Sequence, residues 1–336
     1  MNYFKWLFLC VLVIALSSCN GQVDKMNGVS FVAARDTINQ HHINPVVKVN
    51  ANFAAIMPFG FIKELSNPEI VHNTDRQLFG ETRAGAKQYI EELRKANIKV
   101  MIKPQIWVWR GEFTGLIEMK TEENWKLLEA SYTRFILEYA ELAQEINAEV
   151  LCIGTELENF VKNRPEFWNR LITKIKTMYK GKLTYASNWD EFKRTPFWEQ
   201  LDYIGVDAYF PVSDKQTPTF SDAMEGWQKH KPEIKALSKK YNRPILFTEY
   251  GYRSVDFSGK EPWVSSRSMT VVNLEAQVNT TKALYETFWH EDWFAGGFIW
   301  KWFHDYENVG GTENPMFTPQ NKPVEAVIKA YYKIEK

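Results

Sequence analysis

Cysteine is scarce in this sequence, net charge is absent, and long apolar runs are almost missing. The 336 residues contain 3 cysteines, and Lys+Arg and Asp+Glu balance at 41 each. So few cysteines exclude a disulfide framework and a cysteine-based metal site. A chain without excess positive charge gives no electrostatic reason to expect nucleic acid as a partner, because phosphate binding needs a concentrated positive surface. Hydrophobic residues at 45% and charged residues at 24% indicate a globular chain.

The one long apolar run is at the N-terminus, where residues 6–16 follow Lys5 and precede Ser17-Ser18-Cys19. The run has the length of a signal peptide and is too short to span a bilayer comfortably. Leu-Ser-Ser-Cys resembles a bacterial lipoprotein signal, which implies cleavage before Cys19 and acylation of that cysteine; an ordinary signal peptide cut nearby is the alternative. We expect removal of residues 1–18, a short linker over 19–27, and an exported protein held at a membrane on its periplasmic or cell-surface side. Cys152 then remains as a buried core thiol.

Several nucleotide and hydrolase motifs are also missing. No Gly-x-Gly-x-x-Gly follows an early strand, and neither a P-loop nor a Gly-x-Ser-x-Gly elbow occurs. The pair His41-His42 has no nearby carboxylate pattern, so we interpret it as surface rather than as metal ligands. The sequence implies neither a metal nor an organic cofactor.

Short apolar runs alternate with helical patterns along the rest of the chain, over 28–336. Eight runs are typical of parallel strands covered on both faces: 28–32, 53–58, 98–104, 149–154, 183–187, 203–207, 245–248 and 297–300. Helices are predicted between them over 85–96, 121–146, 165–179, 220–240, 270–290 and 322–333. The crossover 36–50 contains Pro45, so the sequence does not decide whether this crossover forms a helix. Eight alternations without a long linker predict one (β/α)₈ TIM barrel, an α/β fold in a single domain.

Polar and aromatic residues follow the predicted strands, and in such a barrel the active site forms at the carboxyl ends of the strands. Glu156 ends the fourth strand and Glu249 the seventh, which places them on opposite sides of the barrel mouth. Glycoside hydrolysis needs such a pair, with one carboxyl protonating the leaving oxygen and the other facing the anomeric carbon. Aromatic residues make up 15% of the chain, including 13 Trp, and Trp can serve either a core or a sugar-binding groove.

Three segments carry a family resemblance. Ile102-Lys103-Pro104-Gln105, Ile153-Gly154-Thr155-Glu156 and Phe247-Thr248-Glu249-Tyr250-Gly251 together resemble glycoside hydrolase family 113 of clan A, over nearly the whole mature chain. Activity in that family centres on β-1,4-mannans, and its clan consists of retaining barrel enzymes.

The resemblance implies a role for each matching residue. Glu156 is implied as the acid/base and Glu249 as the nucleophile, with Tyr209 hydrogen-bonded to Glu249. Trp300 is implied as the floor beneath the reacting sugar. The cleft is then lined by Lys103, Trp107, Asn188 and Trp189. One residue departs from the clan: Thr155 stands where many members have an Asn that contacts the sugar 2-hydroxyl, so the choice of sugar epimer stays open.

Alternative interpretations remain for some residues and for the function. Asp207 lies inside a strand, where it has either a buried structural role or a catalytic one. Glu158, two residues after Glu156, is the alternative candidate for the catalytic glutamate of the fourth strand. His304 and Asp305 follow the last strand and either line the cleft or lie outside it. The leading function is hydrolysis of a β-linked polysaccharide or oligosaccharide. A lipid-anchored sugar-binding protein without activity and a transglycosylase on the same scaffold are the alternatives.

Overall fold

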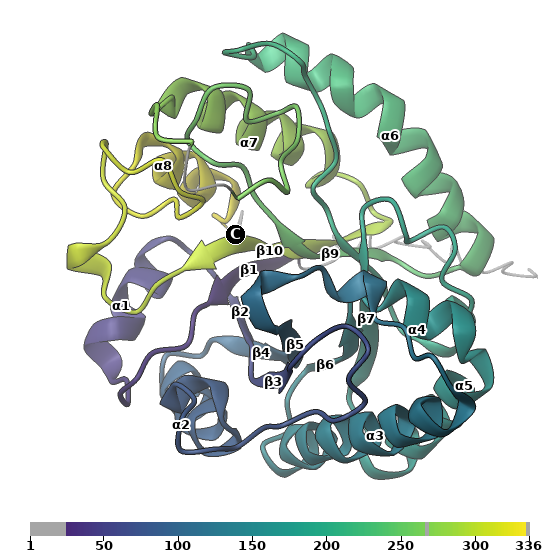
Figure 1. Cartoon of the computed structure of the whole chain (residues 1–336). Coiled ribbons are helices and arrows are strands. Elements are labelled where there is room, and N and C mark those ends of the chain that lie inside the picture. The colour runs from purple at the N-terminus through teal and green to yellow at the C-terminus, as the bar shows by residue number, and fades with distance from the viewer. Residues whose placement is uncertain (1–24, 266–268, 334–336) are drawn as a thin grey trace, which may run out of the picture.

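The computed structural model describes residues 25–265 and 269–333. Eight parallel strands close into a barrel in the order β1-β10-β9-β8-β7-β6-β4-β2, with helices between successive strands (Figure 1). The predicted single-domain (β/α)₈ barrel is therefore confirmed. The barrel strands are β1 (Met26–Phe31), β2 (Phe53–Ile56), β4 (Lys99–Ile102), β6 (Val150–Thr155), β7 (Lys182–Asn188), β8 (Ile204–Asp207), β9 (Ile245–Tyr250) and β10 (Phe294–Trp302). The first strand starts at Met26, two residues before the expected start of the barrel.

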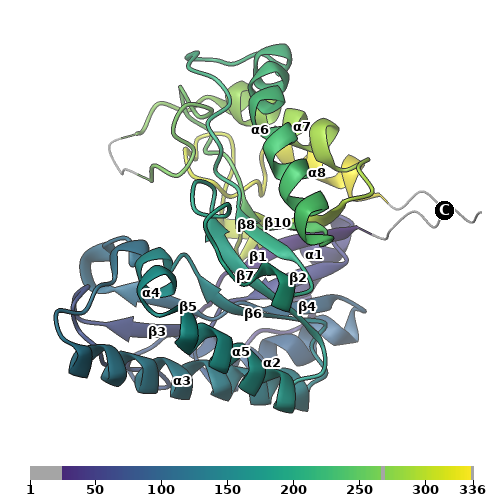
Figure 2. The same ribbon diagram turned by 90° about the vertical axis from the view of Figure 1, so that its right-hand side faces the viewer.

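The helices form an outer layer around the strands. Figure 2 shows α2, α3 and α5 on one side of the strands and α6, α7 and α8 on the other. Their bounds are α1 (Gln40–Lys48), α2 (Arg83–Lys95), α3 (Glu122–Glu145), α4 (Glu158–Asn163), α5 (Pro165–Met178), α6 (Phe220–Tyr241), α7 (Leu274–Phe288) and α8 (Pro323–Tyr331). Thr121 caps α3 by accepting from the Asn124 N–H, and α3 matches the helix predicted over 121–146. The crossover for which the sequence left the helix undecided contains α1. This segment is helical despite Pro45, because Ile43, Pro45 and Val46 are buried and their packing stabilises the helix.

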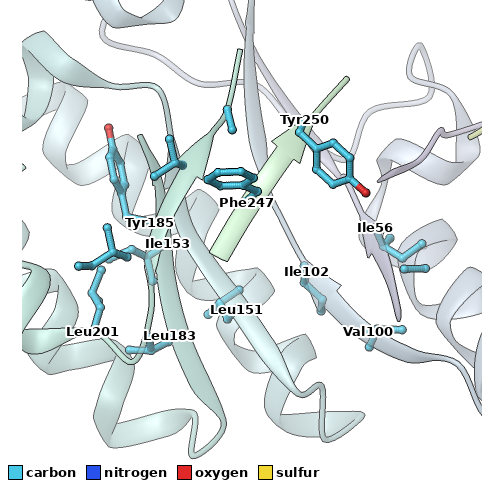
Figure 3. Packing of buried hydrophobic residues seen from close by; sticks show 14 of the residues in the cluster. Ile56, Val100, Ile102, Leu151, Ile153, Leu183, Tyr185, Leu201, Phe247 and Tyr250 are labelled. Carbon is cyan, nitrogen blue, oxygen red and sulfur yellow. The ribbon is translucent and has the colours of Figure 1, made fainter. Parts of the chain in front are cut away.

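Side chains alternate between two cores along each barrel strand, because successive residues of a strand point to opposite faces. On β4, Met101 lies in the cluster inside the barrel, whereas Val100 and Ile102 belong to the large cluster between barrel and helices. Cys152 lies in the inner cluster and is fully buried, which confirms the predicted core thiol. Figure 3 shows side chains of the outer cluster, among them Tyr185 on β7.

The sequence did not reveal a second, two-stranded parallel sheet at the barrel mouth. β3 (Phe59–Ile62) follows β2 after two residues, and β5 (Gln105–Val108) follows β4 in the same way. The pairing continues in register, since Ile56 pairs with Ile102 and Phe59 pairs with Gln105. This pair extends the barrel wall beyond the carboxyl ends of its strands.

The N-terminal prediction falls outside the part of the chain that the structure describes. The signal segment and Cys19 precede residue 25. Among residues 25–265 and 269–333, no helix combines the length and apolar character that a membrane crossing requires.

Candidate active site

A cleft of about 820 Å³ opens at the carboxyl ends of the barrel strands. This volume lies in the range that holds small-molecule ligands. Seven of the predicted site residues line the cleft: Trp107, Glu156, Asn188, Trp189, Tyr209, Glu249 and Trp300. The seven residues lie on or just after β5 to β10, and they meet because parallel strands of a closed barrel end at the same face.

Glu249 lies on β9 with both carboxyl oxygens engaged by donors. The Tyr209 hydroxyl donates to Oε1, and the Lys103 Nζ donates to Oε2 at 2.8 Å. The side chain is almost fully buried, so these bonds form with little competition from water. Each oxygen of Glu249 accepts a hydrogen bond, one from a phenol and one from an ammonium. This arrangement suits an ionised carboxylate and holds it in one orientation.

Lys103 is the cation that Glu249 shares with Asp207. Its Nζ lies 3.0 Å from each carboxyl oxygen of Asp207, and the Thr248 hydroxyl donates to Asp207 Oδ1 at 2.8 Å. Burial favours the neutral amine, but the attraction of Asp207 and Glu249 outweighs it and raises the pKa of Lys103. Burial also raises the pKa of Asp207 to about 6, against the opposing pull of Lys103. Asp207 therefore serves a buried, hydrogen-bonded role in this network.

Glu156 stands just past β6 in a different environment. Its φ of 50° lies in the left-handed region, which costs a non-glycine residue about 1–2 kcal/mol. Three neighbours fix the backbone there: the Glu156 N–H donates to Ala186 O, the Thr114 hydroxyl donates to Glu156 O, and the Leu157 N–H donates to the Tyr185 hydroxyl. Because several independent bonds hold this conformation, the side chain is aimed at the cleft by the fold itself.

The charge around Glu156 favours its protonated form. Burial is the largest cause that raises the pKa of Glu156 well above its ordinary value, followed by the negative charges of Asp207 and Glu249. Lys103 opposes the shift but is already shared by those two carboxylates. The site thus contains one carboxyl group whose pKa is raised and another whose two oxygens accept hydrogen bonds from an ammonium and a phenol.

Aromatic side chains form the walls of the cleft. Trp189 and Trp263 stack with ring centroids 5.2 Å apart and an interplanar angle of 18°. Trp107, on β5, is 49% exposed, and Trp263 is 41% exposed. Trp300 lies near the end of β10, which runs to Trp302, and the Lys301 ammonium lies 5.5 Å from the Trp300 ring centroid. Flat, accessible aromatic faces are suited to the C–H faces of sugar rings.

The position of Lys103 differs from the one expected from the resemblance. It was expected to line the cleft, but its side chain is fully buried beneath the carboxylates. A lysine with three donors already directed at two carboxylates contacts substrate only through Glu249. Its role in the structure is to hold the anion.

The sequence reasoning missed three residues at the site. Trp263 and Lys301 line the cleft, and Glu191 is buried behind it. Lys301 directly follows Trp300 and could have been found from that position. Trp263 lies in an irregular segment that offered no periodic pattern, and Glu191 follows β7 by three residues in a turn.

Among the other residues that the sequence raised, Glu158 and His41 do not line the cleft, whereas Thr155 does. Glu158 pairs with Arg194 at 2.5 Å on the surface side of α4. His41 is exposed and contacts Glu307 at 3.5 Å. Thr155 lines the cleft, and its hydroxyl donates to Pro104 O at 3.4 Å. Among the described residues no cluster of His, Cys, Asp and Glu has a metal-binding arrangement.

Comparison with known proteins agrees with this chemistry. Carboxyl pairs at the mouth of a closed parallel barrel are typical of glycoside hydrolases, and the chain is an enzyme of that class, acting on a polysaccharide or oligosaccharide. It belongs to glycoside hydrolase family 113, whose sequence model matches residues 33–322. The family resemblance seen in the sequence is thereby confirmed. No curated protein sequence matches the chain significantly.

Solved structures share the barrel. A family 113 β-mannanase from Alicyclobacillus acidocaldarius in complex with ManMIm has a TM-score of 0.80 at 21% identity, covering 92% of this chain and 97% of that one. A family 113 β-1,4-mannanase in a complex structure gives the same TM-score and identity, with 92% and 99% covered. A β-glucuronidase from Ruminococcus gnavus gives 0.60 at 14% identity, with 92% and 50% covered. At these identities the likeness shows the fold.

Proposed function

We propose that this glycoside hydrolase cleaves β-1,4-mannan or glucomannan with retention of configuration, with Glu249 as nucleophile and Glu156 as acid/base. One observation carries the assignment: two glutamates of one cleft have opposite electrostatic environments. Glu249 accepts from Lys103 and Tyr209, whereas burial and neighbouring carboxylates raise the pKa of Glu156. The roles follow, because a nucleophile must be ionised and a general acid must hold a proton.

The reaction proceeds in two displacements. In the first, a Glu249 oxygen forms a bond to the anomeric carbon while the glycosidic C–O bond breaks, and the Glu156 proton moves to the leaving oxygen. The negative charge of Glu249 is then lost in the ester, so the repulsion that raised the pKa of Glu156 falls. In the second, the Glu156 carboxylate takes a proton from water, whose oxygen attacks the anomeric carbon and releases Glu249.

Two features support a mannan-type polymer as substrate. The two family 113 structures named above are described as a β-mannanase and a β-1,4-mannanase. The cleft is also wide enough for more than one sugar, with aromatic faces from β5 and from the Trp189–Trp263 stack. Thr155 next to the acid/base offers a hydroxyl rather than an amide toward the sugar, so the substrate panel below includes other β-glycans.

The mature protein and a Glu249→Ala variant are incubated with β-mannan, glucomannan, xylan and cellulose, and new reducing ends are measured. We expect release from mannan or glucomannan by the wild type alone, and proton NMR of the first product should show the β anomer. Activity on another glycan alone overturns the substrate, and an α product overturns retention. Binding without any release favours the non-catalytic sugar-binding protein, and longer oligosaccharides at high substrate concentration indicate a transglycosylase.

We also propose that the enzyme acts while anchored through Cys19 on the outer side of a membrane. The support is the Leu16-Ser17-Ser18-Cys19 sequence after an apolar run. Cells that express the full chain should incorporate labelled fatty acid into it and hold it in the membrane fraction, and Cys19→Ala should abolish both. Equal labelling of the variant contradicts the anchor.

A further inference from the structure

A buried hydrogen-bonded chain runs behind the acid/base, on the side away from the cleft. The Leu157 N–H donates to the Tyr185 hydroxyl at 2.7 Å, and that hydroxyl donates to Glu191 Oε1 at 2.8 Å. Tyr185 is fully buried and Glu191 is 2% exposed. A phenol is suited to this place because one hydroxyl can accept and donate at once.

The same carboxyl group also holds the neighbouring strand end. Glu191 Oε2 accepts from the Asn188 N–H at 3.1 Å. Asn188 ends β7 and lines the cleft. The Glu191 side chain thus holds two backbone segments that border the cleft. It holds the segment after β6 through Tyr185, and it holds the end of β7 directly.

The peptide that Tyr185 holds is the one that follows Glu156, whose backbone has a φ of 50°. A residue in the left-handed region keeps that conformation only when its surroundings over-determine it. Loss of the Leu157 bond leaves the peptide between Glu156 and Leu157 held by the Thr114 hydroxyl alone, so we expect it to rotate more and to shift the carboxyl group with it.

We propose that Tyr185 and Glu191 form a positioning clamp that aims the acid/base Glu156 at the glycosidic oxygen. The clamp consists of the Leu157 N–H, Tyr185, Glu191 and the Asn188 N–H. The proposal rests on the function proposed above for Glu156. Neither clamp side chain lines the cleft, so both act through the backbone of residues that do.

The clamp also contributes charge to the site. Glu156 faces Asp207 on β8, Glu249 on β9, Lys103 after β4 and Glu191 after β7. The carboxyl groups of Asp207, Glu249 and Glu191 raise the pKa of Glu156, and the Lys103 ammonium lowers it. A neutral residue at position 191 therefore lets Glu156 lose its proton at lower pH.

Glu191 itself is surrounded by few charges. Burial raises the pKa of Glu191 to about 8, against hydrogen bonds from Asn188 and Tyr185. Glu158 on α4 raises this pKa further and Arg194 lowers it, and these two pair with each other. Glu191 is therefore ionised only above about pH 8, and only there does its charge oppose the loss of the proton from Glu156.

The test compares leaving groups. Aryl β-oligomannosides carrying 2,4-dinitrophenol need little help from an acid, whereas phenyl analogues need a well-placed proton donor. Tyr185→Phe should lower kcat/KM for the phenyl substrate about 10- to 100-fold and change the dinitrophenyl value less than about 3-fold. Glu191→Gln should lower the phenyl value in the same sense.

Tyr179→Phe is the matched control. Tyr179 is buried, and its hydroxyl donates to Ala148 O at 2.7 Å near the opposite end of β6. The Tyr179→Phe variant should lose about as much stability as Tyr185→Phe. It should keep the wild-type ratio of kcat/KM between the phenyl and dinitrophenyl substrates. Equal loss on both substrates for Tyr185→Phe overturns the clamp.

A second measurement separates this proposal from the function on which it rests. If the wild type cleaves neither substrate, the proposed function has failed, and the clamp is judged from the protein alone. The carboxyl carbon of Glu156 is followed by NMR in ¹³C-glutamate-labelled protein, with Glu156→Gln to assign it. Tyr185→Phe should change the chemical shift of the Glu156 carboxyl carbon, because the peptide that holds it loses a bond, and Tyr179→Phe should not; an unchanged Glu156 signal in Tyr185→Phe overturns the proposal.

Discussion

The two carboxylates of this cleft are held in opposite ways. On the β8–β9 side, Glu249 is fixed through its own side-chain atoms by Lys103 and Tyr209. On the β6–β7 side, Glu156 is fixed through its backbone, by bonds to the peptide groups on either side of it. A nucleophile must present charge at a set point, so direct charged contacts suit it. A general acid must release its proton, and a strong bond to its carboxyl group would hold that proton back.

This difference shows how a fold can give one residue type two roles. Lys103 supplies one positive charge that Asp207 and Glu249 share, and the third carboxyl group nearby, Glu156, has no cation of its own among the contacts described for it. Burial then raises the pKa of Glu156. The two glutamates differ because the site holds more carboxyl groups than cations. In a site of low dielectric, each further negative charge is costly.

The largest expected effect separates the two glutamates directly. Glu249→Gln removes the atom that bonds to the sugar, so kcat/KM should fall on the order of 10⁴-fold or more for every substrate. Glu156→Gln removes only the proton, so the loss should be about 10²- to 10⁴-fold for poor leaving groups and small for dinitrophenyl glycosides. Stopped-flow and steady-state assays on both substrates measure this. Similar losses for the two variants on all substrates contradict the assignment.

Next in size is the removal of the shared cation. Lys103→Met leaves Asp207 and Glu249 buried without their ammonium, which should cost about 3–5 kcal/mol in the free energy of unfolding. Urea unfolding at neutral pH measures it. The double variant Lys103→Met with Asp207→Asn should recover part of the loss, because one uncompensated charge is gone. A single variant as stable as the wild type shows that the network contributes nothing.

A smaller effect is expected for the second contact of Glu249. Tyr209→Phe removes one donor and keeps the ring against Phe317. We expect kcat to fall about 10- to 100-fold with KM within about 2-fold, because the lost bond orients the nucleophile rather than the substrate. Michaelis–Menten kinetics on mannan check this. A change confined to KM shows that Tyr209 acts on substrate binding instead.

Much of this site was predictable because the barrel has strict geometry. Short continuous apolar runs gave the eight strands, and the rule that chemistry gathers at their carboxyl ends selected Glu156 and Glu249, to which the family resemblance added Tyr209 and Trp300. All four line the cleft. The helices predicted over 121–146 and 220–240 also agree with α3 and α6 to within one residue at each end.

The remainder depends on side-chain direction and on tertiary contacts. Lys103 follows a strand end like the others, and nothing in its sequence context shows that it turns under the cleft to meet Asp207. Trp263 reaches the cleft from an irregular segment, and Glu191 acts through a tyrosine of the outer core. β3 and β5 are four residues each and pair only because β2 and β4 already lie side by side. Such contacts have no local pattern to read.

The smallest expected effect concerns stability and pH. Because the pKa of Glu156 is raised above its ordinary 4.5, the folded protein keeps a proton that the unfolded chain releases. The free energy of unfolding therefore falls as the pH rises above about 4.5.

Glu156→Gln cannot lose a proton, so it escapes this penalty. It should match the wild type at pH 4 and exceed it by about 1 kcal/mol at pH 8, and denaturant unfolding at both values measures the difference. Asp207 and Glu191 have raised pKa values too, but they are present in both proteins and largely cancel. Glu249→Gln is the contrasting variant: it leaves Lys103 with one carboxylate fewer and should gain no stability at pH 8. If both variants are stabilised equally there, the two glutamates are not in different environments, and the comparison between them fails.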